Sequence, residues 1–264
     1  MIDALLDIAA SAGRAILERY GATQSTLKAD ESPLTAADLA SHHLILGRMN
    51  ELLPDALVLS EESDPSLFAP DAFPGEFWLV DPLDGTKEFL KQSGEFTVNI
   101  ALIRDRRPVL GVVHAPAIGL TYWADDGGLA HRRRGSGPAE VIRARAPQRG
   151  RLTAVASRDH AGPRVEAWLR GHPDAQTTSM GSSLKFCLVA EGAADLYLRD
   201  LPTMEWDTAA AHAVLAAAGG TVWTLDGSPL RYGKPGLRNP GFAALVDRAI
   251  YFDEFSSPSS SSIP

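Results

Sequence analysis

Two aspartates, Asp81 and Asp84, follow a short apolar run and frame the turn-like sequence D-P-L-D-G-T at residues 81–86. Carboxylates this close repel one another, so each needs a partner or must raise its pKa. Asp-Pro and Asp-Gly pairs are also common turn sequences. From this stretch alone, an ordinary turn and a cation-binding site are both open.

Two further acidic clusters stand at the ends of predicted elements. Glu61 and Glu62 follow the strand-like run V-L-S, and Glu205 and Asp207 flank Trp206 where a helix is predicted to begin. Asp207 alone could be a helix N-cap. Three such clusters together favour a site for a hard cation such as Mg²⁺, which binds a few carboxylates along with water and phosphate. The sequence has no Cys/His cluster with zinc spacing, which disfavours zinc.

The composition of the 264 residues is that of an ordinary globular protein, with 45% hydrophobic and 22% charged residues. The net charge of −8 argues against general binding to nucleic acid or anionic membranes. The single cysteine, Cys187, excludes an internal disulfide and is expected in the core. No apolar run approaches the roughly 20 residues of a membrane span, and Met1 leads directly into an amphipathic helix. We therefore expect a cytoplasmic protein, with peripheral association at the inner membrane left open.

The hydrophobic pattern changes character near residue 150. Before it, helices are predicted over 2–20 and from an N-cap at Thr35, in a capping box with Asp38, to about Leu53. Strands follow at 56–59, 77–80, 97–103, 109–114 and 120–124, with hairpin spacing that predicts a largely antiparallel sheet. After residue 150, strands at 152–156, 195–198 and 221–224 alternate with helices at 164–170, 183–191 and 207–218, which indicates α/β structure.

We therefore predict a mixed α/β protein in two sub-domains, residues 1–150 with most metal ligands and 151–250 with substrate-binding residues. A site is expected between them. The Ser-rich residues at the end of 251–264 predict a disordered tail. The arginine-rich stretch over 132–151 lacks interleaved aromatics, so it is predicted to be a solvated surface rather than a polyanion site.

Taken together, these motifs resemble those of a known enzyme family. D-P-L-D-G-T, with S-E-E upstream and W-D downstream, resembles the inositol monophosphatase superfamily of Mg²⁺-dependent, lithium-sensitive phosphatases. Residues 28–38, 81–103, 181–199 and 202–210 resemble, more narrowly, the CysQ-type 3′(2′),5′-bisphosphate nucleotidases. T-K-E-F after the second aspartate is the most telling part, because inositol monophosphatases usually continue with T-N-F. The resemblance covers roughly residues 1–243 and implies the layered α-β-α-β-α sandwich of the sugar phosphatases.

The resemblance implies a two-metal centre, with a third ion left open. Glu61, Asp81 and the Leu83 carbonyl would hold one Mg²⁺, and Asp81, Asp84 and Asp207 would hold the second. Sharing Asp81 would join the two ions in one clamp.

The resemblance also assigns catalysis to Asp38, Thr86 and Glu61. Thr86, hydrogen-bonded to Asp38, would align a water and help to deprotonate it. Capping the helix is the alternative role for Asp38, and Thr86 could equally be a turn hydroxyl.

Substrate contacts follow from the same matching positions. Besides the metal ligands Glu61, Leu83, Asp84 and Asp207, they include Gly85, Thr86, His160, Ser182, Lys185 and Arg199. Ser182, Lys185 and Arg199 would bind a second phosphate, and His160 would pack against adenine. Taken alone, Arg199 could form a surface salt bridge, Lys185 could lie on a solvated helix face, and His160 could be incidental.

The implied function is a magnesium-dependent hydrolase that removes the 3′-phosphate of adenosine 3′,5′-bisphosphate to give AMP. The corresponding phosphosulfate, PAPS, is a further candidate substrate, which would place the phosphatase in sulfate assimilation. Inositol-1-phosphate or fructose-1,6-bisphosphate phosphatase activity is the alternative within the superfamily. A non-catalytic metal- or nucleotide-binding protein is less favoured, because a binder would not need Thr86 and Asp38. The expected partner is a small nucleoside bisphosphate rather than nucleic acid, in a monomer or homodimer.

Overall fold

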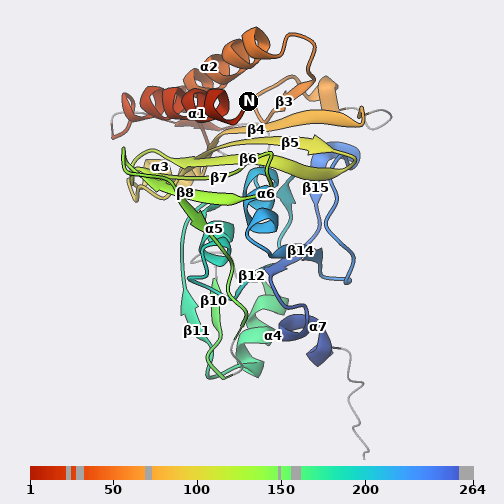
Figure 1. Ribbon diagram of the computed structural model, residues 1–264. Coiled ribbons are helices and arrows are strands. Elements are labelled where there is room, and N and C mark those ends of the chain that lie inside the picture. Colours follow the sequence, from red (N-terminus) through yellow and green to blue (C-terminus); the bar gives the residue numbers. More distant parts are fainter. Residues whose placement is uncertain (22–24, 28–32, 69–72, 148–149, 156–161, 256–264) are drawn as a thin grey trace, which may run out of the picture.

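The computed structural model describes residues 1–21, 25–27, 33–68, 73–147, 150–155 and 162–255. Its elements stack as helices, sheet, helices, sheet and helices (Figure 1). This order confirms the predicted layered α-β-α-β-α architecture. Three buried apolar clusters fill the spaces between successive layers.

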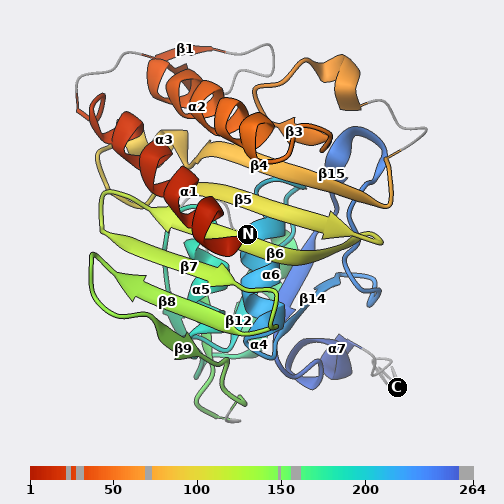
Figure 2. The same ribbon diagram turned by 45° about the horizontal axis from the view of Figure 1, so that its top comes forward.

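The outermost layer on the N-terminal side consists of α1 (Ile2–Leu17) and α2 (Ala36–Leu52), which lie over one face of the first sheet (Figure 2). The Thr35 hydroxyl accepts hydrogen bonds from the N–H groups of Ala37 and Asp38, and Asp38 accepts one from the Thr35 N–H. The predicted capping box is therefore confirmed. A short hairpin, β1 (Ser25–Leu27) with β2 (Pro33–Thr35), precedes α2.

The first sheet has seven strands in chain order. They are β3 (Val58–Ser60), β4 (Glu76–Asp84), β5 (Thr97–Arg104), β6 (Arg107–Ala115), β7 (Leu120–Ala124), β8 (Ala130–Arg134) and β9 (Glu140–Ile142). Only β3 and β4 pair in parallel, so the predicted antiparallel character is confirmed. The hydrophobic pattern did not predict β8 and β9. The 3₁₀ turn η1 (Pro65–Phe68) precedes β4, and the short α3 (Thr86–Leu90) follows it.

The second sheet has five strands in the order β11, β10, β12, β16, β14. Their bounds are Gln176–Thr178, Thr153–Val155, Leu196–Arg199, Phe242–Leu245 and Thr221–Thr224. The first three are parallel, whereas β16 is antiparallel to β12 and β14. A separate antiparallel pair consists of β13 (Thr203–Met204) and β15 (Arg238–Asn239), and the turn η2 (Pro235–Leu237) directly precedes β15.

Helices α5 (Leu184–Ala190) and α6 (Ala209–Ala217) lie between the two sheets (Figure 1). A Cβ on Gly111 of β6 would lie only 2.3 Å from the Ala210 carbonyl oxygen. The glycine and the alanine-rich helix therefore allow α6 to approach the first sheet very closely, which fixes the position of the chain just before the helix. On the far side of the second sheet lie α4 (Pro163–Gly171) and α7 (Ala249–Phe255).

Helix α7 corrects the predicted tail. Tyr251 is 3% exposed, and the Trp168 indole N–H donates to the Ile250 carbonyl at 3.3 Å. Residues 251–255 are therefore helical, with Tyr251 in one apolar cluster with Val165 and Trp168 of α4, while 256–264 lie outside the described residues. No described helix combines the length and the apolarity that crossing a membrane requires.

The arginine-rich stretch is largely exposed, as predicted, but two of its arginines form ion pairs. Arg132 pairs with Glu140 at 2.7 Å and with Glu191 at 2.8 Å. Arg145 pairs at 2.7 Å with Asp195, whose side chain is 1% exposed. These arginines therefore connect β8, β9 and the following segment to the second half of the chain.

Candidate active site

Strand β4 carries both aspartates of the D-P-L-D motif. Asp81 faces Asn99 on β5 and Asp84 faces Thr97, so the motif contains one residue more than its partner strand. Such an insertion is a β-bulge, a feature often found beside active sites. Pro82 is compatible with the bulge because proline has no N–H and this position pairs with no residue of β5. Both aspartates therefore lie within the strand, and the turn that Asp-Gly indicates comes directly after it, at Gly85.

The chain reverses direction one residue later, at Gly85. Its φ of +91° lies in the left-handed region, where glycine is favoured. This turn brings the Thr86 hydroxyl to 3.3 Å from Asp38 Oδ1 and 3.4 Å from the Leu83 carbonyl oxygen. The structure thus brings together the Thr86–Asp38 pair that the family resemblance implied, and Asp38 also caps α2.

Three aspartates are each held by one carboxylate oxygen. Oδ1 of Asp81 accepts from the Leu83 N–H at 3.0 Å, and Oδ2 of Asp207 accepts from the Met204 N–H at 2.8 Å. Oδ2 of Asp84 accepts from the Ser183 N–H at 2.6 Å. Within the described part of the chain, the second oxygen of each carboxylate has no hydrogen bond. One oxygen of each side chain is thus left for a ligand.

The electrostatics of these aspartates favour a cation. Burial raises the pKa of Asp81 well above its usual range, and repulsion from Glu61, Asp84 and Asp207 raises it further. Burial likewise raises the pKa of Asp207, together with repulsion from Asp84 and Glu61. A nearby cation would favour the ionised forms.

A pocket of about 400 Å³ collects the site residues. It is lined by Glu61, Asp81, Leu83, Asp84, Gly85, Thr86, Ser182, Lys185, Arg199 and Asp207, all of which the sequence predicted. Asp38 lies behind Thr86 and is not in the lining. His160 lies outside the described residues. The pocket is acidic toward β4 and the start of α6 and cationic toward α5 and β12, while Lys87 and Glu88 of α3 place one charge of each sign between them.

The donor set of this pocket fits Mg²⁺. Carboxylate oxygens and a carbonyl are the hard ligands that this ion prefers. In the described part of the chain, no three Asp, Glu, His or Cys side chains already converge into a formed metal site. Glu61, Asp81 and Asp207 instead share one pocket wall, and their mutual repulsion opposes closer approach.

Lys185 corrects the alternative of a solvated helix face. The residue is only 8% exposed, and its ammonium donates to the Ser182 carbonyl at 3.0 Å. Burial lowers the pKa of Lys185, and the nearby Asp84 carboxylate partly offsets this. Arg199 donates to the Leu201 carbonyl at 3.2 Å and forms no salt bridge with any described residue. Both cations therefore face the pocket instead of the outer surface.

Ser182 has an unusual backbone and an unsatisfied hydroxyl. Its φ of +47° lies in the left-handed region, which is uncommon for a residue other than glycine. Its Oγ is buried and has no hydrogen-bond partner among the described residues. Leaving a buried hydroxyl unpaired costs about 1–3 kcal/mol. A ligand in the pocket that accepts from this hydroxyl would remove that cost.

Comparison with known proteins shows which family this chain belongs to. The inositol monophosphatase family model matches residues 1–248. The chain belongs to the inositol monophosphatase family. It is 47% identical over 250 residues to the 3′(2′),5′-bisphosphate nucleotidase CysQ of Escherichia coli K12, covering 93% of this chain and 100% of that protein. The resemblance found in the motifs is thereby confirmed.

Solved structures of the family share the fold. CysQ from Bacteroides thetaiotaomicron matches with a TM-score of 0.79 and 41% identity, covering 93% of this chain and 97% of that one. An inositol monophosphatase from Thermotoga maritima matches with a TM-score of 0.75 at 20% identity. At that identity the likeness shows the fold alone.

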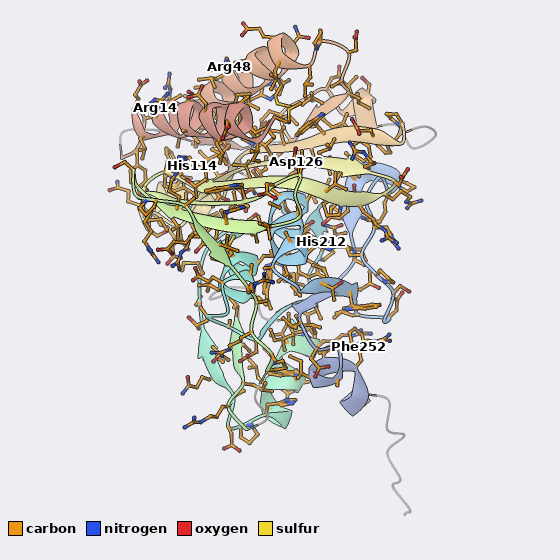
Figure 3. The ribbon with its side chains drawn as sticks, in the orientation of Figure 1. Arg14, Arg48, His114, Asp126, His212 and Phe252 are labelled. Carbon is orange, nitrogen blue, oxygen red and sulfur yellow. The ribbon has the colours of Figure 1, made fainter. Side chains whose placement is uncertain are left out.

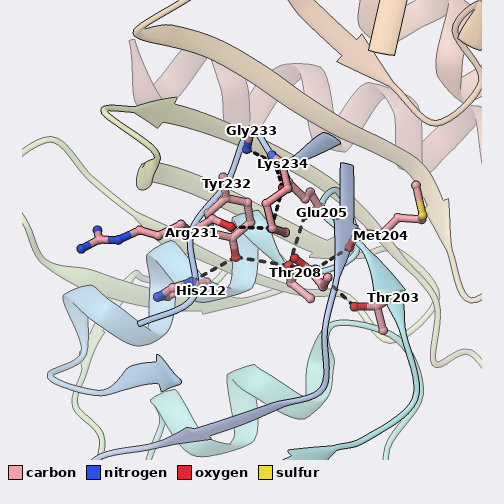
Figure 4. A network of polar contacts seen from close by, with 10 residues as sticks. Thr203, Met204, Glu205, Thr208, His212, Arg231, Tyr232, Gly233 and Lys234 are labelled. Carbon is pink, nitrogen blue, oxygen red and sulfur yellow. Dashed lines mark hydrogen bonds and ion pairs between the residues drawn. The ribbon is translucent and has the colours of Figure 1, made fainter. Parts of the chain in front are cut away.

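The third acidic cluster divides between two roles in this member of the family. Asp207 faces the pocket, but Glu205 is fully buried behind it. Glu205 accepts from the N–H groups of Gly233 and Lys234 at 2.7 and 2.9 Å, and the Lys234 ammonium lies 2.5 Å away (Figure 4). Glu205 is therefore a structural residue that holds the 231–234 segment against the start of α6.

Several residues of the site were not predicted from the sequence. Asn99 and Ser183 bind Asp84 from behind, and Phe186, Tyr197 and Phe242 line the pocket. Asn99 carried a signal, because it is a polar residue within the otherwise apolar run V-N-I-A-L-I. The aromatic residues carried none, since each also fits an ordinary core position.

Proposed function

We propose that this chain is a Mg²⁺-dependent 3′(2′),5′-bisphosphate nucleotidase that hydrolyses the 3′-phosphate of adenosine 3′,5′-bisphosphate to AMP, and that it also accepts the corresponding phosphosulfate. The observation that supports this most is the division of the pocket into an acidic and a cationic wall. A substrate with two phosphates at opposite ends matches both. The E. coli relative carries the name of this activity.

The acidic wall would receive the phosphate that is cleaved. Glu61, Asp81 and the Leu83 carbonyl would hold one Mg²⁺, and Asp81, Asp84 and Asp207 a second. When bound, such ions screen the phosphate charge, acidify water and stabilise the leaving oxygen. This chemistry requires no covalent nucleophile, and Cys187 is not placed to be one, since it is buried in the core, where burial raises the pKa of its thiol.

Thr86 and Asp38 would orient the attacking water. Because the Thr86 hydroxyl donates toward Asp38, its lone pairs are directed elsewhere and can accept a hydrogen bond from water. Asp38 is 2% exposed and is fixed by the capping box, so its carboxylate cannot swing away. The pair therefore holds the water in one orientation and draws off its proton.

The cationic wall would bind the phosphate that stays. Lys185, Arg199 and the Ser182 hydroxyl line this wall and can bind that phosphate. A protein with a net charge of −8 needs such local cations to retain a doubly phosphorylated nucleotide.

The test is a phosphate-release assay on the purified protein with Mg²⁺ and with excess EDTA. Adenosine 3′,5′-bisphosphate, inositol 1-phosphate and fructose 1,6-bisphosphate are compared at equal concentration. We expect the nucleotide to give the highest kcat/KM and EDTA to abolish the reaction. A higher kcat/KM for inositol 1-phosphate or fructose 1,6-bisphosphate would overturn the substrate assignment, and full activity in EDTA would overturn the metal assignment.

A further inference from the structure

Ser183 lies where three elements of the site meet. Its Oγ is 2.7 Å from Asp84 Oδ2 and 2.7 Å from the Asp207 carbonyl oxygen, and Asn99 Nδ2 donates to it at 2.8 Å. The residue is 2% exposed. Ser183 thus connects the end of β4 with the entry to α6, and β5 supports it from behind.

The hydroxyl is not used in the way that its position on the helix suggests. Ser183 is the N-cap of α5, and a serine there usually accepts from a backbone N–H of the first turn. Here the side chain caps none of them. Instead, both its N–H and its hydroxyl point to Asp84 Oδ2, at 2.6 and 2.7 Å. Ser183 therefore binds the Asp84 carboxylate instead of capping α5.

The Ser183 hydroxyl has fewer protons to donate than it has acceptors close by, which restricts how these groups can be arranged. A serine hydroxyl has one proton, while two acceptors, Asp84 Oδ2 and the Asp207 carbonyl, lie equally close to it. Asn99 uses its amide N–H groups on Ser183 Oγ and on Asp84 Oδ2, the latter at 3.3 Å. Its own Oδ1 is buried with no partner among the described residues. The amide orientation is therefore set by Ser183 and Asp84.

We propose that Ser183 is a positioning residue that sets the separation of Asp84 and Asp207 and so forms the second Mg²⁺ site; this rests on the proposed function. Asp84 belongs to the first sheet, whereas α5 and α6 lie between the sheets. The Ser183 N–H donates to Asp84 Oδ2, and the single proton of its hydroxyl can go to the Asp207 carbonyl, so this one residue holds Asp84 and the Asp207 backbone relative to each other. The unbonded oxygens of both carboxylates are thereby held toward the pocket that they share.

The test is Mg²⁺ titration by calorimetry, on wild type and Ser183→Ala, with AMP and inorganic phosphate present. These products are included because Mg²⁺ is held by carboxylates and phosphate together. We expect two binding events in the wild type. The substitution should leave the tighter one unchanged and weaken the other about 10- to 100-fold, as is typical when a residue behind a metal ligand is removed.

Ser179→Ala is the matched control. Ser179 lies in the same segment, and its buried Oγ has no hydrogen bond to any described residue. It should bind both ions like the wild type. Two ions bound with unchanged affinity in Ser183→Ala, or both weakened equally, would overturn the inference while leaving the proposed function intact. A wild type that binds no Mg²⁺ would instead overturn the proposed metal centre, and this inference with it.

Discussion

The hydroxyl of Thr86 lies 3.3 Å from Oδ1 of Asp38, a residue 48 positions earlier in the chain. The contact joins the first turn of α3 to the first turn of α2 across the end of β4. Each carboxylate oxygen of Asp38 therefore has its own function: Oδ2 accepts the capping hydrogen bond of α2, and Oδ1 accepts a hydrogen bond from Thr86. These two functions can be separated by substitution.

Asp38→Asn should lower kcat by about 10²- to 10⁴-fold, the usual contribution of general acid–base catalysis. The asparagine oxygen can still accept from the Thr35 N–H, but its amide would then donate to Thr86 and reverse that hydrogen bond. Steady-state kinetics at saturating Mg²⁺, together with a Mg²⁺ titration, should show lost turnover at unchanged metal affinity.

Thr35→Ala is the control for the helix cap. It removes the capping hydroxyl, which costs about 1 kcal/mol of stability, but it retains the Asp38 carboxylate. We expect a lower melting temperature with kcat within a few-fold of wild type. Equal losses of kcat in Thr35→Ala and Asp38→Asn would mean that Asp38 acts only through the helix.

Asp81→Asn should abolish turnover and yet stabilise the metal-free protein. Because the pKa of Asp81 is raised in the folded state, the folded protein holds a proton that the unfolded chain releases above pH about 4. The free energy of unfolding without Mg²⁺ therefore falls as the pH rises from about 4 toward the raised pKa. The asparagine removes this penalty.

Urea unfolding in EDTA between pH 4 and 8 measures the effect. The exposed Asp105, in the turn between β5 and β6, gives the control Asp105→Asn, which should follow the wild-type curve. If Asp81→Asn unfolds more easily than wild type at pH 7 without metal, the carboxylate is not under electrostatic strain.

The sequence could predict those parts of the site that local patterns determine. The Thr35 capping box follows from residue types three positions apart, and D-P-L-D-G-T marks the metal motif by its own composition. The capping box, which the structure confirms, and the acidic motif both depend on neighbours in the chain.

The remaining features depend on contacts between distant segments. The β-bulge in β4 exists only relative to β5, so the sequence predicted the strand only to residue 80 and left a turn open for D-P-L-D. Glu205 and Asp207 look alike in sequence, and only the packing of the 231–234 segment separates a structural acid from a pocket acid. Ser183 appeared only as the first residue of the helix predicted over 183–191, because its acceptor lies 99 positions away.

His212 should make the protein sensitive to acid. It lies on α6 between the sheets (Figure 3), where burial and then the charges of Arg231 and Lys234 lower its pKa to about 3. The unfolded chain binds a proton near pH 6.5, whereas the folded protein does not. The stability associated with neutral His212 is therefore complete above pH 6.5 and is lost as the pH falls toward 3, by about 1.4 kcal/mol per pH unit.

His212→Asn should flatten this dependence by about one proton. The asparagine Nδ2 takes the place of the imidazole Nδ1, which lies 3.0 Å from the Tyr232 hydroxyl. Urea unfolding at pH 7 and pH 5 gives the comparison, and the exposed His43 supplies the control His43→Asn. A slope between pH 7 and 5 that equals the wild-type slope would rule out this role for His212.

Lys185→Met should separate binding of the second phosphate from catalysis. Methionine retains most of the buried volume but removes the charge, and a hydrogen bond to a charged group contributes about 1.5–3 kcal/mol. We expect kcat/KM for adenosine 3′,5′-bisphosphate to fall roughly 10- to 150-fold. Hydrolysis of 3′-AMP, which lacks the 5′-phosphate, should change little. The ratio of the two kcat/KM values is the measurement, because damage to the acidic wall would lower both. A proportional loss on both substrates would show that Lys185 supports the fold or the carboxylates instead of the substrate.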